Sequence, residues 1–214
     1  METQIKSLLK FPSDFSEKGL KDLAQEIMNK IYIFNGKYQF RPIEIEFYIY
    51  DKDKHADVHV YPRDKKEAGE LFFHLSGMDI CFESSLEKGR FGGILIRALE
   101  REKEGEKTKQ LLGGPLICKD EVLNTATGKC EIKTLNTPHI DKEAQVSPRQ
   151  GINQDKKKQD EDTFWNKNYR FIRGDIKIDK IDRLVDTFDF GQKAPKVPKP
   201  KRSYSLKYQP PKDK

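Results

Sequence analysis

The sequence has few of the features that mark secreted, membrane-spanning or zinc-binding proteins. Its only cysteines are Cys81, Cys118 and Cys130, and no two of them form a CxxC pair. This argues against a disulfide framework and against a zinc site built on cysteine. No apolar run approaches the roughly 18 residues that cross a bilayer, and the N-terminus lacks the apolar segment of a signal peptide. We therefore expect a cytoplasmic protein, of the bacterial cytosol or nucleoid type, that has no contact with a membrane.

Signatures of common catalytic sites are also missing. No HExxH spacing occurs, and His55 and His59 stand in a loop or strand context rather than on one face of a helix. The glycines at 92, 93, 113 and 114 form neither a P-loop nor a GxGxxG fingerprint. Nucleophile arrangements built on serine, cysteine or lysine do not appear either. We expect no metal ion and no cofactor.

The composition indicates a folded core combined with long polar segments. Of the 214 residues, 35% are hydrophobic and 36% are charged, with a mean hydropathy of −0.84. The net charge of +6 permits an anionic partner, but 35 acidic residues are mixed among the 41 basic ones. This length fits one ordinary domain, and we expect a monomer.

The C-terminal segment differs from the rest. From Lys193 onward it has eight basic residues, one acid and five prolines, a composition that cannot bury a core and predicts a disordered or extended tail. We therefore divide the chain into a domain at 1–192 and a Lys/Pro-rich tail at 193–214. Lys199, Lys201 and Arg202 in this tail are expected to make non-specific contacts with DNA phosphates.

The pattern of apolar residues in the first hundred positions predicts one helix and several consecutive strands. The helix is expected at 13–30, capped by Ser13 or Ser16. A hairpin with a type I′ turn at Asn35-Gly36 follows it. Further strands are expected at 43–50, 58–61, 70–76, 78–82 and 94–99, a polar loop at 151–162, and a strand and helix at 175–190. This order favours an α+β domain with a curved, mostly antiparallel sheet packed with helices.

The strand at 43–50 is the most informative segment. Its strict alternation places four apolar side chains on one face and four polar ones on the other, namely Glu44, Glu46, Tyr48 and Tyr50. Two carboxylates and two phenols in register suggest the wall of a site, although a solvated strand face would give the same pattern. A carboxylate beside aromatic rings gains a raised pKa or holds a water as general base, so Glu46, Tyr48 and His55 form a candidate site.

Seven short motifs follow one another along the chain. They are I-E-I-E-F-Y at 43–48, H-A-D-V-H-V-Y-P-R-D at 55–64, G-E-L-F-F-H-L-S-G-M-D-I-C-F-E at 69–83, I-L-I-R-A-L-E-R at 94–101, G-G-P at 113–115, P-R-Q-G-I at 148–152, and Trp165 with Arg170-Phe171. In this order they resemble the 3-methyladenine (alkyladenine) DNA glycosylase family over residues 11 to 174. The blocks at 69–83 and 94–101 are the most specific.

The resemblance implies that family's fold and a monofunctional DNA glycosylase that acts on a modified purine in double-stranded DNA. Such enzymes flip the damaged base out of the helix. Glu46 matches the carboxylate that activates a water to attack the sugar, through a transition state like that of glycoside hydrolysis. Tyr48 and His55 match residues that contact the flipped base, and Arg97 matches an arginine of the site. Arg63 and Arg149, in two of the motifs, are expected to contact DNA.

Several positions depart from the family pattern. His74 stands at the third position of the base pocket, after Tyr48 and His55, where the family has an aromatic tyrosine. Glu83 stands where the family has an asparagine that discriminates between bases. The tyrosine wedge that precedes Gly-Met has no counterpart, since Ser76 runs directly into Gly77. Two alternatives follow: a non-catalytic descendant of this fold that binds nucleic acid or protein, and a hydrolase that cleaves the N-glycosidic bond of a small nucleoside-like substrate.

Overall fold

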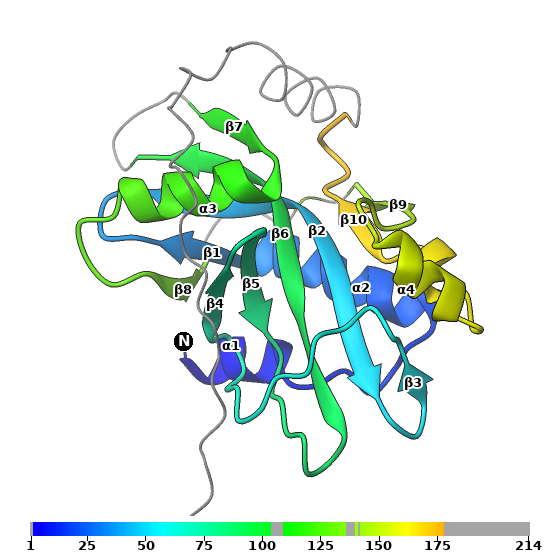
Figure 1. The fold of residues 1–214 in the computed structure, drawn as a ribbon. Coiled ribbons are helices and arrows are strands. Elements are labelled where there is room, and N and C mark those ends of the chain that lie inside the picture. Colours follow the sequence, from blue (N-terminus) through cyan, green and yellow to red (C-terminus); the bar gives the residue numbers. More distant parts are fainter. Residues whose placement is uncertain (1, 104–108, 136–139, 141, 178–214) are drawn as a thin grey trace, which may run out of the picture.

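The body of the protein is one antiparallel sheet. The computed structural model describes residues 2–103, 109–135, 140 and 142–177. Its strands are β1 (Ile31–Phe34), β2 (Gln39–Asp51), β3 (His55–Ala56), β4 (Leu71–His74), β5 (Gly77–Cys81), β6 (Arg90–Glu102), β7 (Gln110–Gly113), β8 (Glu131–Thr134), β9 (Gln145–Ser147) and β10 (Arg170–Ile172). Six of them follow the order β4-β5-β6-β2-β1-β8 (Figure 1), while β3 and β10 join β2, β7 joins β6 and β9 joins β10. The predicted α+β class with a mostly antiparallel sheet is confirmed.

Four α-helices and one 3-10 turn pack around the sheet in the described residues. They are α1 (Glu2–Leu8), α2 (Glu17–Lys30), α3 (Pro115–Asn124), α4 (Gln154–Gln159) and the turn Phe164–Asn166. Ser16 caps α2, because its side-chain oxygen accepts a hydrogen bond from the Gly19 N–H at 3.0 Å. The helix predicted from residue 13 therefore exists but begins after Ser16. Its buried face, with Leu20, Ala24 and Ile27, packs into the main core.

The two longest strands, β2 and β6, pair along almost their whole length and form the centre of the sheet. Their register shifts on both sides of Glu44, which is the signature of a β-bulge. As a result, Ile43 packs in a small separate cluster with Ala98 and Ile172, whereas Ile45 and the following apolar residues enter the main core. The expectation that Ile43 shares a face with Ile45, Phe47 and Ile49 is wrong for this reason.

The structure also differs from the prediction in three other local segments. The hairpin between β1 and β2 exists, but only Gly36 has a positive φ, and a type I′ turn needs two such residues. The Asn35 carboxamide instead accepts hydrogen bonds from Lys37 and Tyr38 N–H. Residues 58–61 form turns rather than a strand, and α4 interrupts the predicted loop at 151–162. The strand and helix predicted at 175–190 lie almost wholly outside the described residues, as does the tail from 193.

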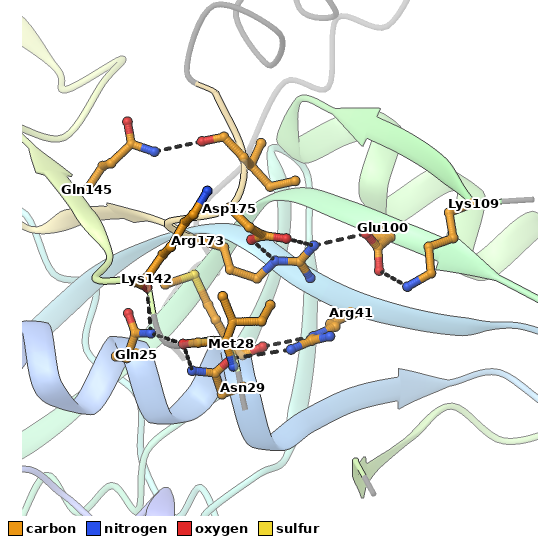
Figure 2. A network of polar contacts seen from close by, with 12 residues as sticks. Gln25, Met28, Asn29, Arg41, Glu100, Lys109, Lys142, Gln145, Arg173 and Asp175 are labelled. Carbon is orange, nitrogen blue, oxygen red and sulfur yellow. Dashed lines mark hydrogen bonds and ion pairs between the residues drawn. The ribbon is translucent and has the colours of Figure 1, made fainter. Parts of the chain in front are cut away.

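Two sets of polar contacts lie near the start of β2, one around Arg173 and Glu100 and one around Arg41 (Figure 2). The Arg173 guanidinium contacts Glu100 at 2.9 Å and Asp175 at 2.7 Å, and Lys109 reaches the other oxygen of Glu100 at 2.8 Å. Arg41 donates to the Met28 carbonyl at 3.1 Å at the end of α2. Side chains thus join strand β6 to the segment after β10 and, separately, join strand β2 to helix α2.

Candidate functional site

One face of the sheet carries a row of mostly polar side chains that crosses six strands. Residues directly opposite each other in an antiparallel pair share a face. The observed register therefore aligns Ser147, Arg170, Glu46, Leu95, Asp79 and Phe72. The opposite face holds the main core, so the polar face predicted for the strand at 43–50 is real. It is not solvated, however, because Glu44 is 1% exposed and Glu46 is 0% exposed.

The Glu46 carboxylate is held by three donors from different parts of the chain. Its Oε1 accepts a hydrogen bond from the Gln150 backbone N–H at 2.8 Å and lies 3.3 Å from Arg97 Nη1. Its Oε2 accepts a hydrogen bond from the Tyr48 hydroxyl at 3.0 Å. The Arg97 side chain also donates to the Gln150 carboxamide at 3.1 Å. Arg97 and Gln150 thus lie over the carboxylate and close it from solvent.

Glu46 belongs to a buried cluster in which two glutamates and two arginines balance each other's charge. Glu44 Oε1 accepts from Arg97 Nε at 2.7 Å and from Arg170 Nε at 2.6 Å. Burial raises the pKa of Glu46 above its ordinary value, although the positive charge of Arg97 and the Gln150 N–H act in the opposite direction. Burial alone lowers the pKa of Arg97, but Glu46 and Glu44 outweigh it and raise that pKa. Burial therefore favours the neutral form of Glu46, whereas Arg97 and the Gln150 N–H favour the ionised form.

Tyr48 connects this cluster to a second buried ion pair. The Arg149 guanidinium lies 4.6 Å from the centre of the Tyr48 ring and contacts Asp57 at 2.7 Å. It also donates to the carbonyls of Phe47 and Phe164. Both charged side chains of this pair are fully buried. Arg149 is thus occupied inside the protein, and we do not retain it as a surface contact for DNA.

His55 lies close to this ion pair but does not face an open site. Its Nδ1 is 2.8 Å from the Ile49 carbonyl and its Nε2 is 2.8 Å from the Tyr169 hydroxyl. Its ring packs against Phe15 and Phe164. Burial lowers the pKa of His55 and raises that of Tyr169 to about 12. His55 is thus a neutral, internally bonded residue that anchors the end of β2 rather than a wall of a pocket.

His74 and Arg63 reach the same face of the sheet from the far side of β6. Arg63 forms an ion pair with Asp79, and His74 Nε2 lies 3.3 Å from the other oxygen of that carboxylate. Arg63 crosses the sheet directly above Gly93, where any β-carbon would meet its guanidinium. Arg63 is therefore committed to an internal ion pair, and Asp79 is its partner.

The remaining predicted residues do not join the site. Glu83 is exposed and lines a surface groove of about 510 Å³ together with Lys6, Lys10, Lys65 and Lys66. Lys199, Lys201 and Arg202 lie outside the described residues.

Among the residues that are described, no group of three or more His, Cys, Asp or Glu side chains could hold a metal ion. None of the described helices is long and apolar enough to cross a membrane.

Two residues of the site were not among the predicted ones. Gln150 supplies a backbone donor to Glu46, and Arg170 pairs with Glu44. Both stand in motifs singled out in the sequence, P-R-Q-G-I and Arg170-Phe171, so position in a motif was the available signal. What the motifs could not give was which atom of each residue faces the carboxylate.

Comparison with known proteins adds little about chemistry. No protein-family model matches the chain. An alignment of 116 positions with an uncharacterized protein of Acanthamoeba polyphaga mimivirus shows 31% identity and covers 44% of this chain and 53% of the viral protein. The chain thus spans about half the length of the curated relative that it matches. Because that relative is itself uncharacterized, the likeness assigns no activity.

Proposed function

We propose that this protein is a DNA glycosylase-like enzyme that hydrolyses the N-glycosidic bond of a modified purine. One observation carries the proposal: three of the motifs that resemble the alkyladenine DNA glycosylases meet at a single carboxylate. Glu46 belongs to the motif at 43–48, Arg97 to that at 94–101 and Gln150 to that at 148–152, and all three are in contact. A resemblance limited to composition gives no reason for such distant segments to converge.

Glu46 keeps an acceptor position on Oε2 that a water could use. A carboxylate oxygen has two lone pairs, and the hydrogen bond from Tyr48 uses only one of those on Oε2. A water at the second position would donate to Oε2 and lose its proton there as its oxygen attacks the sugar C1′. The sugar carries positive charge in the transition state, and the ionised carboxylate stabilises it. Arg97 favours that ionised form.

Access to Glu46 in this proposal goes through Gln150. Its side chain is exposed, and only one hydrogen bond, from Arg97, joins it to the site. Displacing that carboxamide removes one of the two groups that cover the carboxylate and leaves the buried pairs behind it intact. Tyr48 is the remaining wall residue for a flipped base, whereas His55 and Glu83 have other surroundings.

The missing tyrosine wedge has a structural substitute in this proposal. Leu75 forms the tip of the hairpin between β4 and β5 and is 94% exposed, the highest value among the large hydrophobic residues that the structure describes. Apolar side chains of this kind enter between base steps in proteins that distort DNA. Leu75→Ala is expected to reduce base release from duplex DNA by about tenfold, within the few kcal/mol that unstacking costs, and to leave release from single-stranded DNA unchanged.

A second candidate function is a non-catalytic descendant that binds nucleic acid. The complete burial of Glu46 favours it, because a carboxylate closed by Arg97 and Gln150 also suits a purely structural ion-pair cluster. Salt-sensitive binding of DNA without loss of a base would support this alternative.

The proposal is tested by incubating the protein with DNA that contains hypoxanthine, ethenoadenine or a methylated purine, followed by cleavage of abasic sites with hot alkali. We expect strand breaks at the modified base with the wild-type protein and none with Glu46→Gln. Equal release by both proteins, or no release by the wild type on any of these substrates, rejects the glycosylase function.

A further inference from the structure

Two pairs of lysine and aromatic side chains lie on the surface formed by residues 58–61 and by the segment from α4 to Trp165. Lys156 Nζ lies 4.2 Å from the centre of the Tyr61 ring and donates to the Val58 carbonyl at 3.1 Å. Lys157 Nζ lies 4.7 Å from the Trp165 ring. The Tyr61 side chain is 67% exposed and Trp165 is partly exposed. We call these four residues, Tyr61, Lys156, Lys157 and Trp165, the stacking platform.

A buried, hydrogen-bonded pair of side chains holds the stacking platform in place from below. His59 Nε2 lies 2.8 Å from Asp160 Oδ2, and both side chains are at most 2% exposed. The same Asp160 oxygen accepts a hydrogen bond from the Trp165 backbone N–H at 2.9 Å, and the His59 backbone N–H donates to Asp57 at 3.0 Å. Burying such pairs brings little net stability but defines geometry. Two loops distant in sequence are thereby held in one arrangement, with aromatic rings facing out.

The platform is joined to the Glu46 site through Arg149. Asp57, which holds the loop of Tyr61, forms the buried pair with Arg149, and Arg149 donates to the carbonyl of Phe164, the neighbour of Trp165. The Arg149 guanidinium lies over Tyr48, whose hydroxyl contacts Glu46. Gln150, which closes Glu46, follows Arg149 in the chain and precedes α4 by four residues.

We propose that the stacking platform binds a single nucleic-acid strand next to the Glu46 site. Aromatic rings accept stacked bases of any sequence, and lysines beside them attract the phosphates. Tyrosine and tryptophan flanked by lysine are the residue types of such surfaces. Lys158 and Lys167 add positive charge, while Asp155, Glu161 and Asp162 are acids of the same segment. Because these charges nearly cancel, stacking contributes more than phosphate contacts, and the salt dependence of binding is expected to be shallow.

This inference rests on the proposed function only for the identity of the strand, which would be the stretch that flanks a flipped base. Binding itself does not need catalysis. Glu46→Gln is therefore expected to bind a strand as well as the wild type, while variants of the platform lose affinity.

Trp165 provides a direct readout because it is the only tryptophan of the chain. Its emission is followed while an unlabelled single-stranded oligonucleotide is added to the full-length protein. We expect saturable quenching, since a base stacked on the indole changes its emission. Tyr61→Ala should raise the oligonucleotide concentration at half-maximal quenching by about tenfold, within the range for loss of one stacked base. Tyr61→Phe keeps the ring and should bind like the wild type. Leu86→Ala, another exposed apolar residue, serves as the matched control and should bind like the wild type.

The result that overturns the inference is also specific. No binding up to about 100 µM, the weak end of non-specific affinity, rejects the platform. So does binding that leaves the Trp165 emission and the Tyr61→Ala midpoint unchanged. Failure of the proposed function is separable, because a platform that binds without forming abasic sites supports this inference and rejects only the catalysis.

Discussion

The backbone N–H of Gln150 lies 2.8 Å from the carboxylate of Glu46, although 104 positions separate the two residues in the chain. Strand β10 pairs with β2 beside Glu46, and β9 pairs with β10, so the segment that follows β9 is delivered to this carboxylate. The site is therefore a product of the sheet topology. Its chemistry depends on how the pKa of Glu46 is balanced between burial and its three donors.

The hydrogen bond from Tyr48 should set part of that balance. It favours the ionised form of Glu46 and lowers its pKa, so Tyr48→Phe should raise that pKa. Base release requires the ionised carboxylate and therefore falls as the pH drops through the pKa of Glu46. The acid limb of the pH–rate profile should move to higher pH by about one unit, the shift that corresponds to one hydrogen bond to a charged group. Tyr50→Phe, whose ring stacks on Phe91, should leave the profile unchanged.

Glu46 should cost the protein stability at neutral pH. Its pKa is raised in the folded state, so its contribution to stability is present below the unfolded pKa and is lost as the pH rises through the folded pKa. Glu46→Gln, which cannot ionise, should have the higher melting temperature at pH 8, by about 2–4 °C for each kcal/mol. The difference should vanish at pH 4. A variant that melts lower than the wild type at pH 8 would show that the pairing with Arg97 outweighs burial.

The ion pair between Asp57 and Arg149 should be sensitive to the loss of one partner. Both side chains are fully buried, and an uncompensated buried charge costs about 3–5 kcal/mol. Asp57→Asn should therefore lower the melting temperature by about 10 °C. The double variant Asp57→Leu with Arg149→Met removes both charges and should recover most of that loss. Thermal unfolding followed by circular dichroism measures both, and a single variant as stable as the wild type would contradict this description of the pair.

Glu100 should contribute to stability in the opposite pH range from Glu46. Burial alone would raise its pKa, but hydrogen bonds from Lys109 and Arg173 outweigh burial and lower it (Figure 2). Its contribution is present above the ordinary glutamate pKa and is lost as the pH falls through the lower, folded-state pKa. Glu100→Gln should thus unfold at a lower denaturant concentration than the wild type at pH 7. The difference between the two denaturation midpoints should become smaller as the pH falls toward 3. Glu102→Gln is the control, since that side chain is 42% exposed.

The sequence predicted the sheet better than the surroundings of the site. Alternation of apolar residues located β2, β5 and β6, because each has one face in the main core and period 2 is a strong signal. Helix α3 was missed because its apolar residues do not form one stripe, although Pro115 at its first turn was a start signal. The bulge at Ile43 has no signature in the residues themselves, since it arises from the pairing of β2 with β6.

For the site, the residue types were informative and their partners were not. Glu46, Tyr48 and Arg97 lie together as their motifs suggested. His55 and Arg149 were equally plausible site residues by residue type and motif position. Their actual partners, Tyr169 and Asp57, are set by tertiary packing, which the sequence does not reveal. A histidine with both nitrogens bonded inside cannot be distinguished from a pocket residue by spacing alone.

The most direct test of the account is base release by wild-type protein and by Glu46→Gln from the same modified duplex. We expect abasic sites with the wild type and a loss of at least about 100-fold with the variant, the range for removing one general base. Release at equal rates by the two proteins would contradict the assignment of Glu46 as the group that activates water.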